Sequence, residues 1–123
     1  MKLLIVDDSN IIRSRIARLS SDRRLPTWQI VGLARNGMEA INVFIKAKPE
    51  VVTMDLTMPE MDGVQCTDAM VRLNPAIKIL VVSALCDKAT ALTALKRGAQ
   101  GFLHKPFTDE QLISALQELA EPT

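Results

Sequence analysis

Short apolar runs alternate along the whole chain with longer segments whose apolar residues recur at helical spacing. We predict five strands, at residues 3–6, 28–34, 51–54, 77–82 and 101–104. Each run is followed by a segment with the apolar pattern of one helix face. Strands that alternate with helices of about ten residues favour a parallel sheet with helices on both sides. The sequence therefore predicts an α/β fold with a doubly wound, five-stranded parallel sheet.

Length and composition limit the class of protein. A chain of 123 residues fits one domain, so we expect a single domain over 1–123 with no output domain. The net charge of +1 gives no electrostatic reason to expect nucleic acid or an anionic membrane as partner. The apolar runs are far shorter than the roughly 20 residues that span a bilayer, and the N-terminal run that ends in two aspartates does not fit the pattern of a signal peptide. We therefore expect a cytoplasmic protein that does not insert into membranes.

Two of the predicted helices have features that bear on the fold. Asn36-Gly37 is predicted as a turn before the second helix. The buried face of that helix is predicted to carry Ala40, Ile41, Phe44 and Ile45. The fourth helix, roughly 88–97, has a weak apolar stripe of Leu92 and Leu95, and Gly98 is a suitable C′ residue to end it.

Polar side chains stand at the C-terminal ends of four predicted strands. Asp7 and Asp8 follow the first strand, Asp55 the third, Ser83 the fourth and Lys105 the fifth. Because right-handed crossovers bring these strand ends to one edge of the sheet, and ligands bind at that edge, the five residues are expected to converge. Each of them taken singly could be only a turn residue or a helix cap. Their occurrence together indicates one site.

Three carboxylates in one site repel one another, and a hard divalent cation removes that repulsion. Mg²⁺ prefers oxygen ligands and often shares its coordination shell with a phosphate, so Mg²⁺ is the predicted cofactor, with Mn²⁺ as a substitute. Such a site suits phosphoryl transfer, which depends on positioning and charge neutralisation. A carboxylate can itself be the nucleophile and form an aspartyl phosphate.

Roles follow from the positions of these residues. We predict Asp55 as the phosphoacceptor, since it stands alone after a buried run and faces the loop at 56–63. Asp7 and Asp8 are the predicted acidic pair for the metal. Lys105 is predicted to neutralise phosphoryl oxygens, and Ser83 to donate a hydrogen bond to one of them.

The same residues resemble the receiver domain of two-component response regulators. The resemblance covers essentially the whole chain and rests on motifs that match in order and spacing. They are Leu3-Leu4-Ile5-Val6-Asp7-Asp8, Val52-Thr53-Met54-Asp55-Leu56-Thr57-Met58-Pro59-Glu60-Met61-Asp62-Gly63, Val82-Ser83-Ala84 and Lys105-Pro106-Phe107. The chain is most similar to stand-alone chemotaxis regulators of the CheY type.

The resemblance implies a flavodoxin-like strand order, 2-1-3-4-5, and a function. Asp55 would take a phosphoryl group from a phosphohistidine on a sensor histidine kinase. Asp8, Asp55 and the backbone carbonyl of Thr57 would bind Mg²⁺ directly, with Asp7 acting mainly through metal-bound water. Lys105 would pair with the phosphoryl group and be joined to Pro106 by a cis peptide bond.

The resemblance also implies a switch. Ser83 would move toward the phosphoryl group and Phe102 would rotate into the space it vacates. The face formed by the fourth helix, the fifth strand and the last helix would then bind a downstream target, such as a flagellar motor switch component. Thr57 and Leu85 are expected to lie beside the phosphorylation site, where they either tune dephosphorylation or only fill the loop.

Other functions remain open from the sequence. The chain could be a receiver separated from a transcriptional or other output domain, a phosphorelay intermediate, or a scaffold or dimerisation module that is not phosphorylated. An enzyme that hydrolyses phosphate esters through an aspartyl phosphate is disfavoured, because Asp55-Leu56-Thr57 lacks a second Asp. We expect no enzyme activity beyond the chain's own phosphorylation and dephosphorylation.

A basic stretch surrounds the first predicted helix. Its members are Arg13, Arg15, Arg18, Arg23 and Arg24. A solvated face is the favoured interpretation, and docking of an acidic kinase surface is the functional alternative.

Overall fold

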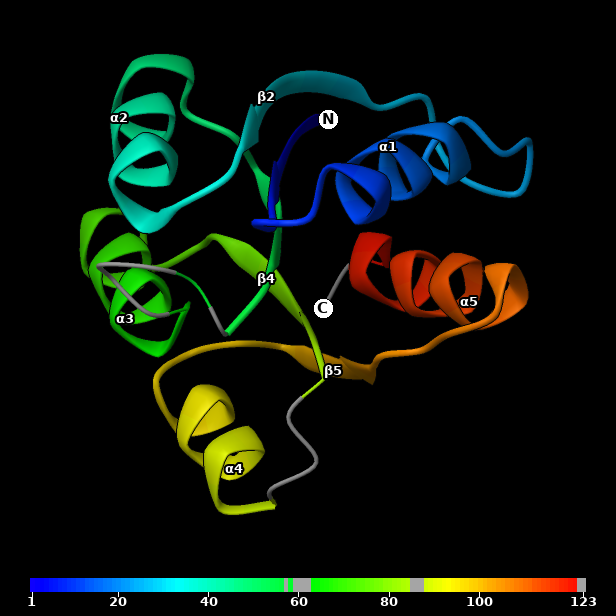
Figure 1. Ribbon diagram of the computed structural model, residues 1–123. Coiled ribbons are helices and arrows are strands. Elements are labelled where there is room, and N and C mark those ends of the chain that lie inside the picture. The colour runs from blue at the N-terminus through cyan, green and yellow to red at the C-terminus, as the bar shows by residue number, and fades with distance from the viewer. Residues whose placement is uncertain (57, 59–62, 85–87, 122–123) are drawn as a thin grey trace.

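Five parallel strands form the central sheet of the computed structural model, which describes residues 1–56, 58, 63–84 and 88–121 (Figure 1). The strands are β1 (Lys2–Val6), β2 (Gln29–Ala34), β3 (Val51–Met54), β4 (Lys78–Ser83) and β5 (Gly101–His104). They lie in the order β2-β1-β3-β4-β5, and every neighbouring pair is parallel. The predicted fold class and strand order are confirmed.

Helices cover both faces of the sheet. The helices are α1 (Asn10–Leu19), α2 (Gly37–Ala47), α3 (Gly63–Leu73), α4 (Lys88–Lys96) and α5 (Asp109–Ala120). Figure 1 shows α1 and α5 on one side of the sheet and α2, α3 and α4 on the other. Leu3 and Ile5 of β1 pack in the core with α1 and α5, while Leu4 and Val6 pack in the core with α2 and α3. This alternation follows from the two-residue period of a strand.

Capping residues determine where several of the helices begin and end. Ser9 accepts a hydrogen bond from the Ile12 amide and begins α1, and Thr108 forms a capping box that begins α5. Gly98 has φ +117° and ends α4, where the Ala99 amide donates to the Ala94 carbonyl. The prediction of Gly98 as the C′ residue is confirmed.

Two details of the second helix differ from the prediction. Asn36 is the N-cap of α2, because its side chain accepts a hydrogen bond from the Glu39 amide at 2.9 Å, and Gly37 is already helical. Ile45 is 57% exposed rather than buried. The prediction of a turn at Gly37 and of a buried Ile45 was wrong, since α2 buries the narrower stripe that contains Ala40 and Phe44.

The fourth helix has little apolar contact with the sheet. Leu92 and Leu95 are exposed, and Ala94 is the buried residue among the α4 side chains that the structure describes. The weak apolar stripe predicted for this helix is confirmed. Within the described residues, no helix has the length and apolar character needed to cross a membrane.

Candidate functional site

Three aspartates meet at the carboxyl edge of the sheet. Asp7 follows β1 directly, with Asp8 next to it, and Asp55 follows β3. One carboxylate oxygen from each lies within 4.8 Å of those of the other two. Asp7 and Asp55 are buried, at 0% and 3% exposure, whereas Asp8 is exposed. The predicted convergence of these residues is confirmed.

Backbone hydrogen bonds hold the two buried aspartates just beyond the ends of their strands. The Asp7 amide donates to the carbonyl of Ala34, and the Asp55 amide donates to the carbonyl of Val6. The positions of both Cα atoms are therefore fixed by the neighbouring strands. The carboxylates stand on a rigid part of the fold, which favours a precisely placed site.

The ammonium group of Lys105 places a positive charge beside the aspartates. Its Nζ lies 2.7 Å from Asp7 Oδ2 and 3.7 Å from Asp55 Oδ2. Its backbone amide donates to the carbonyl of Ser83 at 2.9 Å, which ties the end of β5 to the end of β4. The Lys105-Pro106 peptide bond is cis, as the resemblance implies.

The remaining predicted residues fall into two groups. Ser83 is fully buried at the end of β4, the strand beside β3. Phe102 is half-buried on β5, packs against the core under α2, α3 and α4, and meets the His104 ring edge-to-face with centroids 5.2 Å apart. Thr57 and Leu85 lie outside the described residues, so their predicted roles stay predictions.

The donor set fits a hard divalent cation. Three carboxylates and one ammonium leave a formal charge of −2 at the site. Oxygen ligands of this kind are those that Mg²⁺ prefers, and Mn²⁺ accepts them too. Asp7, Asp8 and Asp55 are the residues that would hold the ion.

Sequence reasoning missed the arginines that brace this site. Arg13 Nη1 donates to the Asp7 carbonyl at 2.6 Å, and Arg15 Nη2 donates to the Phe107 carbonyl at 2.8 Å. Within the described part of the chain, Arg24 does not contact the site: it pairs with Asp22 in the connection after α1 and with Glu110 of α5. A solvated face was therefore the wrong interpretation for Arg13 and Arg15, which are partly buried, whereas Arg24 is exposed. The sequence signal was only their position on and after the helix that follows Asp7-Asp8.

Gly63 was predicted as part of a loop, and it is the first residue of α3. A Cβ atom at Gly63 would lie 2.6 Å from Leu56 Cα and closer still to the Asp55 carbonyl oxygen. The start of α3 therefore touches the backbone that carries Asp55, and only the absence of a side chain permits that contact.

The chain is similar to known proteins over most of its length. Residues 3–117 match a family model described as a response regulator receiver domain. A chemotaxis protein CheY of Listeria monocytogenes is 36% identical over 121 residues, which are 98% of this chain and 99% of that protein. A protein-glutamate methylesterase/protein-glutamine glutaminase of Shewanella frigidimarina is 39% identical over 110 residues, 89% of this chain and 27% of that protein. The solved structure of a LuxR-family two-component response regulator from Aurantimonas sp. superposes with a TM-score of 0.87 at 31% identity, covering 97% of this chain and 84% of that one.

Proposed function

Because this chain belongs to the response regulator receiver domain family, we propose that it is a signalling switch turned on by phosphorylation of Asp55. Domains of this family signal and are not conventional enzymes. The observation that carries the proposal is the buried acidic site, in which three aspartates within 4.8 Å of one another meet the ammonium of Lys105. A sensor histidine kinase is the proposed source of the phosphoryl group.

The transfer step is an in-line displacement at phosphorus. An Asp55 carboxylate oxygen forms the new O–P bond while the bond between phosphorus and the histidine nitrogen of the kinase breaks, and the imidazole leaves with the electron pair. Mg²⁺, when bound, neutralises charge on the phosphoryl oxygens. Lys105 serves the same end, since its ammonium already lies 3.7 Å from Asp55 Oδ2. Ser83 is the proposed hydrogen-bond donor to the phosphoryl group.

The signal is proposed to leave the site through β5. Ser83 and Phe102 are the two switch residues, and Lys105 joins their strands where its amide donates to the Ser83 carbonyl. The α4, β5 and α5 elements form the proposed target-binding face. The exposed Leu92 and Leu95 of α4 support this role, because they leave apolar surface available to a partner.

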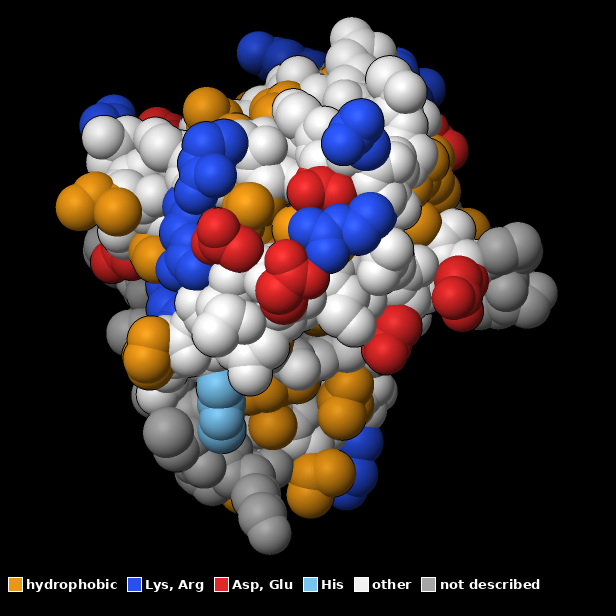
Figure 2. Space-filling view, turned by 90° about the vertical axis from the view of Figure 1, so that its right-hand side faces the viewer, with side chains coloured by type: hydrophobic (Ala, Val, Ile, Leu, Met, Phe, Trp, Pro, Cys, Tyr) orange, Lys and Arg blue, Asp and Glu red, His pale blue; other side chains and the backbone are white. Residues whose placement is uncertain are grey.

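Hollows along β5 and α5 suggest the chemistry of the target. Two hollows of about 360 Å³ each lie along β5 and α5 and share Ala115 and Glu118 in their lining. Their charged lining residues are Glu110, Glu118 and Glu121, with Lys78 as the one basic residue. Figure 2 shows this side of the molecule, with acidic side chains interspersed with Lys and Arg side chains above hydrophobic ones that lie beside the single histidine. We propose a target that presents apolar and basic side chains, and similarity to CheY favours a chemotaxis target such as a flagellar motor switch component.

The switch is testable with beryllofluoride, which mimics the phosphoryl group. We expect Mg²⁺ and beryllofluoride together to shift the NMR signals of Phe102 and of α4, and to change which proteins bind to the immobilised chain. Asp55→Asn is the control that should show neither effect. Unchanged spectra and unchanged binding of the wild-type chain would refute the switch.

A second candidate function is that of a receiver module within a longer protein or of a phosphorelay intermediate. The observation that favours it is the Shewanella relative, in which the matched region is only 27% of the protein. The full reading frame that encodes the native protein separates this candidate from the single domain predicted for 1–123. A purely structural scaffold differs from both because it would not be phosphorylated.

A further inference from the structure

We infer that Arg15 is a positioning residue for the proposed phosphoryl-transfer site, where it holds the segment that carries Lys105. This inference rests on the proposed function of that site. Arg15 lies on α1, and its contacts reach across 92 to 94 residues of sequence to the connection between β5 and α5.

Arg15 makes three kinds of contact with that connection. Its Nη2 donates to the Phe107 carbonyl at 2.8 Å and to Asp109 Oδ1 at 2.8 Å, and its Nε donates to Asp109 Oδ1 at 3.1 Å. Its guanidinium carbon lies 4.4 Å from the centroid of the Phe107 ring. A planar guanidinium can lay its face on a ring while the N–H groups along its edge donate hydrogen bonds, whereas an ammonium has no planar face.

These contacts fix one end of a very short segment. Lys105 is held at the other end, where its amide donates to the Ser83 carbonyl at 2.9 Å. Pro106 between them has no N–H to donate. The backbone at Lys105 is thus anchored to β4 on one side and, through Phe107, to α1 on the other. Phe107 itself is buried, at 5% exposure, in the core shared by α1 and α5.

The side chain of Lys105 depends on this anchoring. Its ammonium is poised between two acceptors, 2.7 Å from Asp7 and 3.7 Å from Asp55. A displacement of about 1 Å at a reacting group can cost roughly 100-fold in rate. Loss of the Arg15 contacts should therefore weaken the pairing of Lys105 with a phosphoryl group on Asp55.

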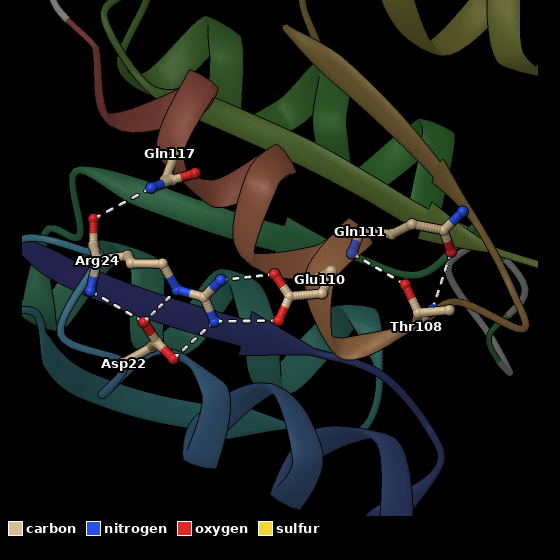
Figure 3. A network of polar contacts seen from close by, with 6 residues as sticks. All are labelled: Asp22, Arg24, Thr108, Glu110, Gln111 and Gln117. Carbon is tan, nitrogen blue, oxygen red and sulfur yellow. Dashed lines mark hydrogen bonds and ion pairs between the residues drawn. The ribbon is translucent and has the colours of Figure 1, made fainter.

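Arg24 offers a matched comparison on the same side of the molecule. Figure 3 shows its guanidinium between Asp22 and Glu110, and Gln117 donating to its backbone carbonyl. Like Arg15, it joins an acidic residue in the first turn of α5 to the region around α1. None of its contacts among the described residues falls within 105–107.

The test compares Arg15→Met with Arg24→Met and the wild-type chain. For each protein we would measure the melting temperature, the Mg²⁺ dissociation constant, the affinity for beryllofluoride with saturating Mg²⁺, and the rate of phosphorylation by acetyl phosphate. We expect Arg15→Met to lower the beryllofluoride affinity and the phosphorylation rate by roughly tenfold or more. Its Mg²⁺ affinity should stay equal or rise, because a loosened Lys105 competes less with the cation for the carboxylates. Arg24→Met should change the Mg²⁺ affinity, the beryllofluoride affinity and the phosphorylation rate by less than about twofold each.

A fall in beryllofluoride affinity without a fall in Mg²⁺ affinity distinguishes a positioning role from a general loss of stability. If Arg15 only stabilised the fold, Arg15→Met would weaken Mg²⁺ binding and beryllofluoride binding together. Arg24→Met would then do the same if it lowered the melting temperature by a similar amount. Equal effects in the two variants, or a parallel loss of both ligands in Arg15→Met, would overturn the inference. If Arg15→Met does not fold, Arg15→Lys carries the same test, since it keeps the charge for Asp109 and loses the planar contacts. Failure of the wild-type chain to bind beryllofluoride or accept a phosphoryl group would instead overturn the proposed function.

Discussion

At the scale of single residues, the site brings like charges close together. Asp7 and Asp55 are buried beside the exposed Asp8, and one ammonium, that of Lys105, offsets them within the described residues. Two carboxylates about 5 Å apart repel each other by roughly 3 kcal/mol at an effective dielectric constant near 20. We therefore expect a bound divalent cation to relieve this repulsion in the folded chain.

The first prediction concerns Asp55→Asn in the presence of a chelator. We expect this variant to unfold with a free energy about 1 to 3 kcal/mol higher than that of the wild-type chain, because the repulsion it removes exceeds the attraction to Lys105 that it loses. Added Mg²⁺ should stabilise the wild-type chain by mass action and the variant much less. Urea unfolding with and without Mg²⁺ measures both effects. A variant less stable than wild type in chelator would contradict this charge balance.

The second prediction concerns Asp22 and pH. Hydrogen bonds from the side chain and the backbone amide of Arg24 lower the pKa of Asp22 from 3.8 to about 2. The folded state therefore binds this proton more weakly than the unfolded state. Asp22 should stabilise the fold above about pH 4, and that contribution should disappear as the pH falls to about 2. The measurement is the difference in unfolding free energy between wild type and Asp22→Asn across this range, and a difference independent of pH would contradict it.

At the scale of elements, the two helices of the proposed target-binding face are held very differently. Helix α5 buries Leu112, Ile113, Leu116 and Leu119. Helix α4 buries Ala94 among its described side chains and exposes Leu92 and Leu95. The weak stripe of α4 was readable from the sequence because leucines alternate there with alanine and threonine. The exposure of Ile45 on α2 was not, because a wide apolar stripe does not reveal which of its edges meets the sheet.

The third prediction follows from this difference in packing. Amide hydrogens of α4 should exchange with solvent at least about tenfold faster than those of α5, because a helix with few buried contacts opens locally at a lower free energy. Hydrogen exchange followed by NMR gives both rates on the same sample. Equal protection of the two helices would show that α4 is held by contacts other than its apolar side chains.

The fourth prediction concerns Gly63 at the start of α3. Gly63→Ala should lower the free energy of unfolding by about 1 to 3 kcal/mol, because its methyl group would press on the backbone of Asp55 and Leu56. Gly101→Ala is the control, since its methyl group would meet only the end of the Leu80 side chain, at 3.2 Å. Denaturant unfolding compares the two. An effect of Gly63→Ala no larger than that of the control would contradict the close approach.

At the scale of the whole molecule, the sequence predicted what depends on local pattern. Periodicity predicted the five strands and the layers, and the strand ends predicted that Asp7, Asp8, Asp55 and Lys105 meet. The bracing by Arg15 escaped prediction because it joins residues 94 apart, and only the packing of α1 beside α5 brings them together. The contact of Arg13 was not predicted because its acceptor is the backbone carbonyl of Asp7, and every residue has such a carbonyl whatever its side chain.

The central claim is the proposal that Asp55 accepts a phosphoryl group. Intact-mass spectrometry after incubation with acetyl phosphate and Mg²⁺ tests it most directly. The account predicts a gain of one phosphoryl group by the wild-type chain, which requires Mg²⁺ and is absent from Asp55→Asn. A wild-type chain that gains no phosphoryl group, or an Asp55→Asn chain that gains one as readily, would contradict it.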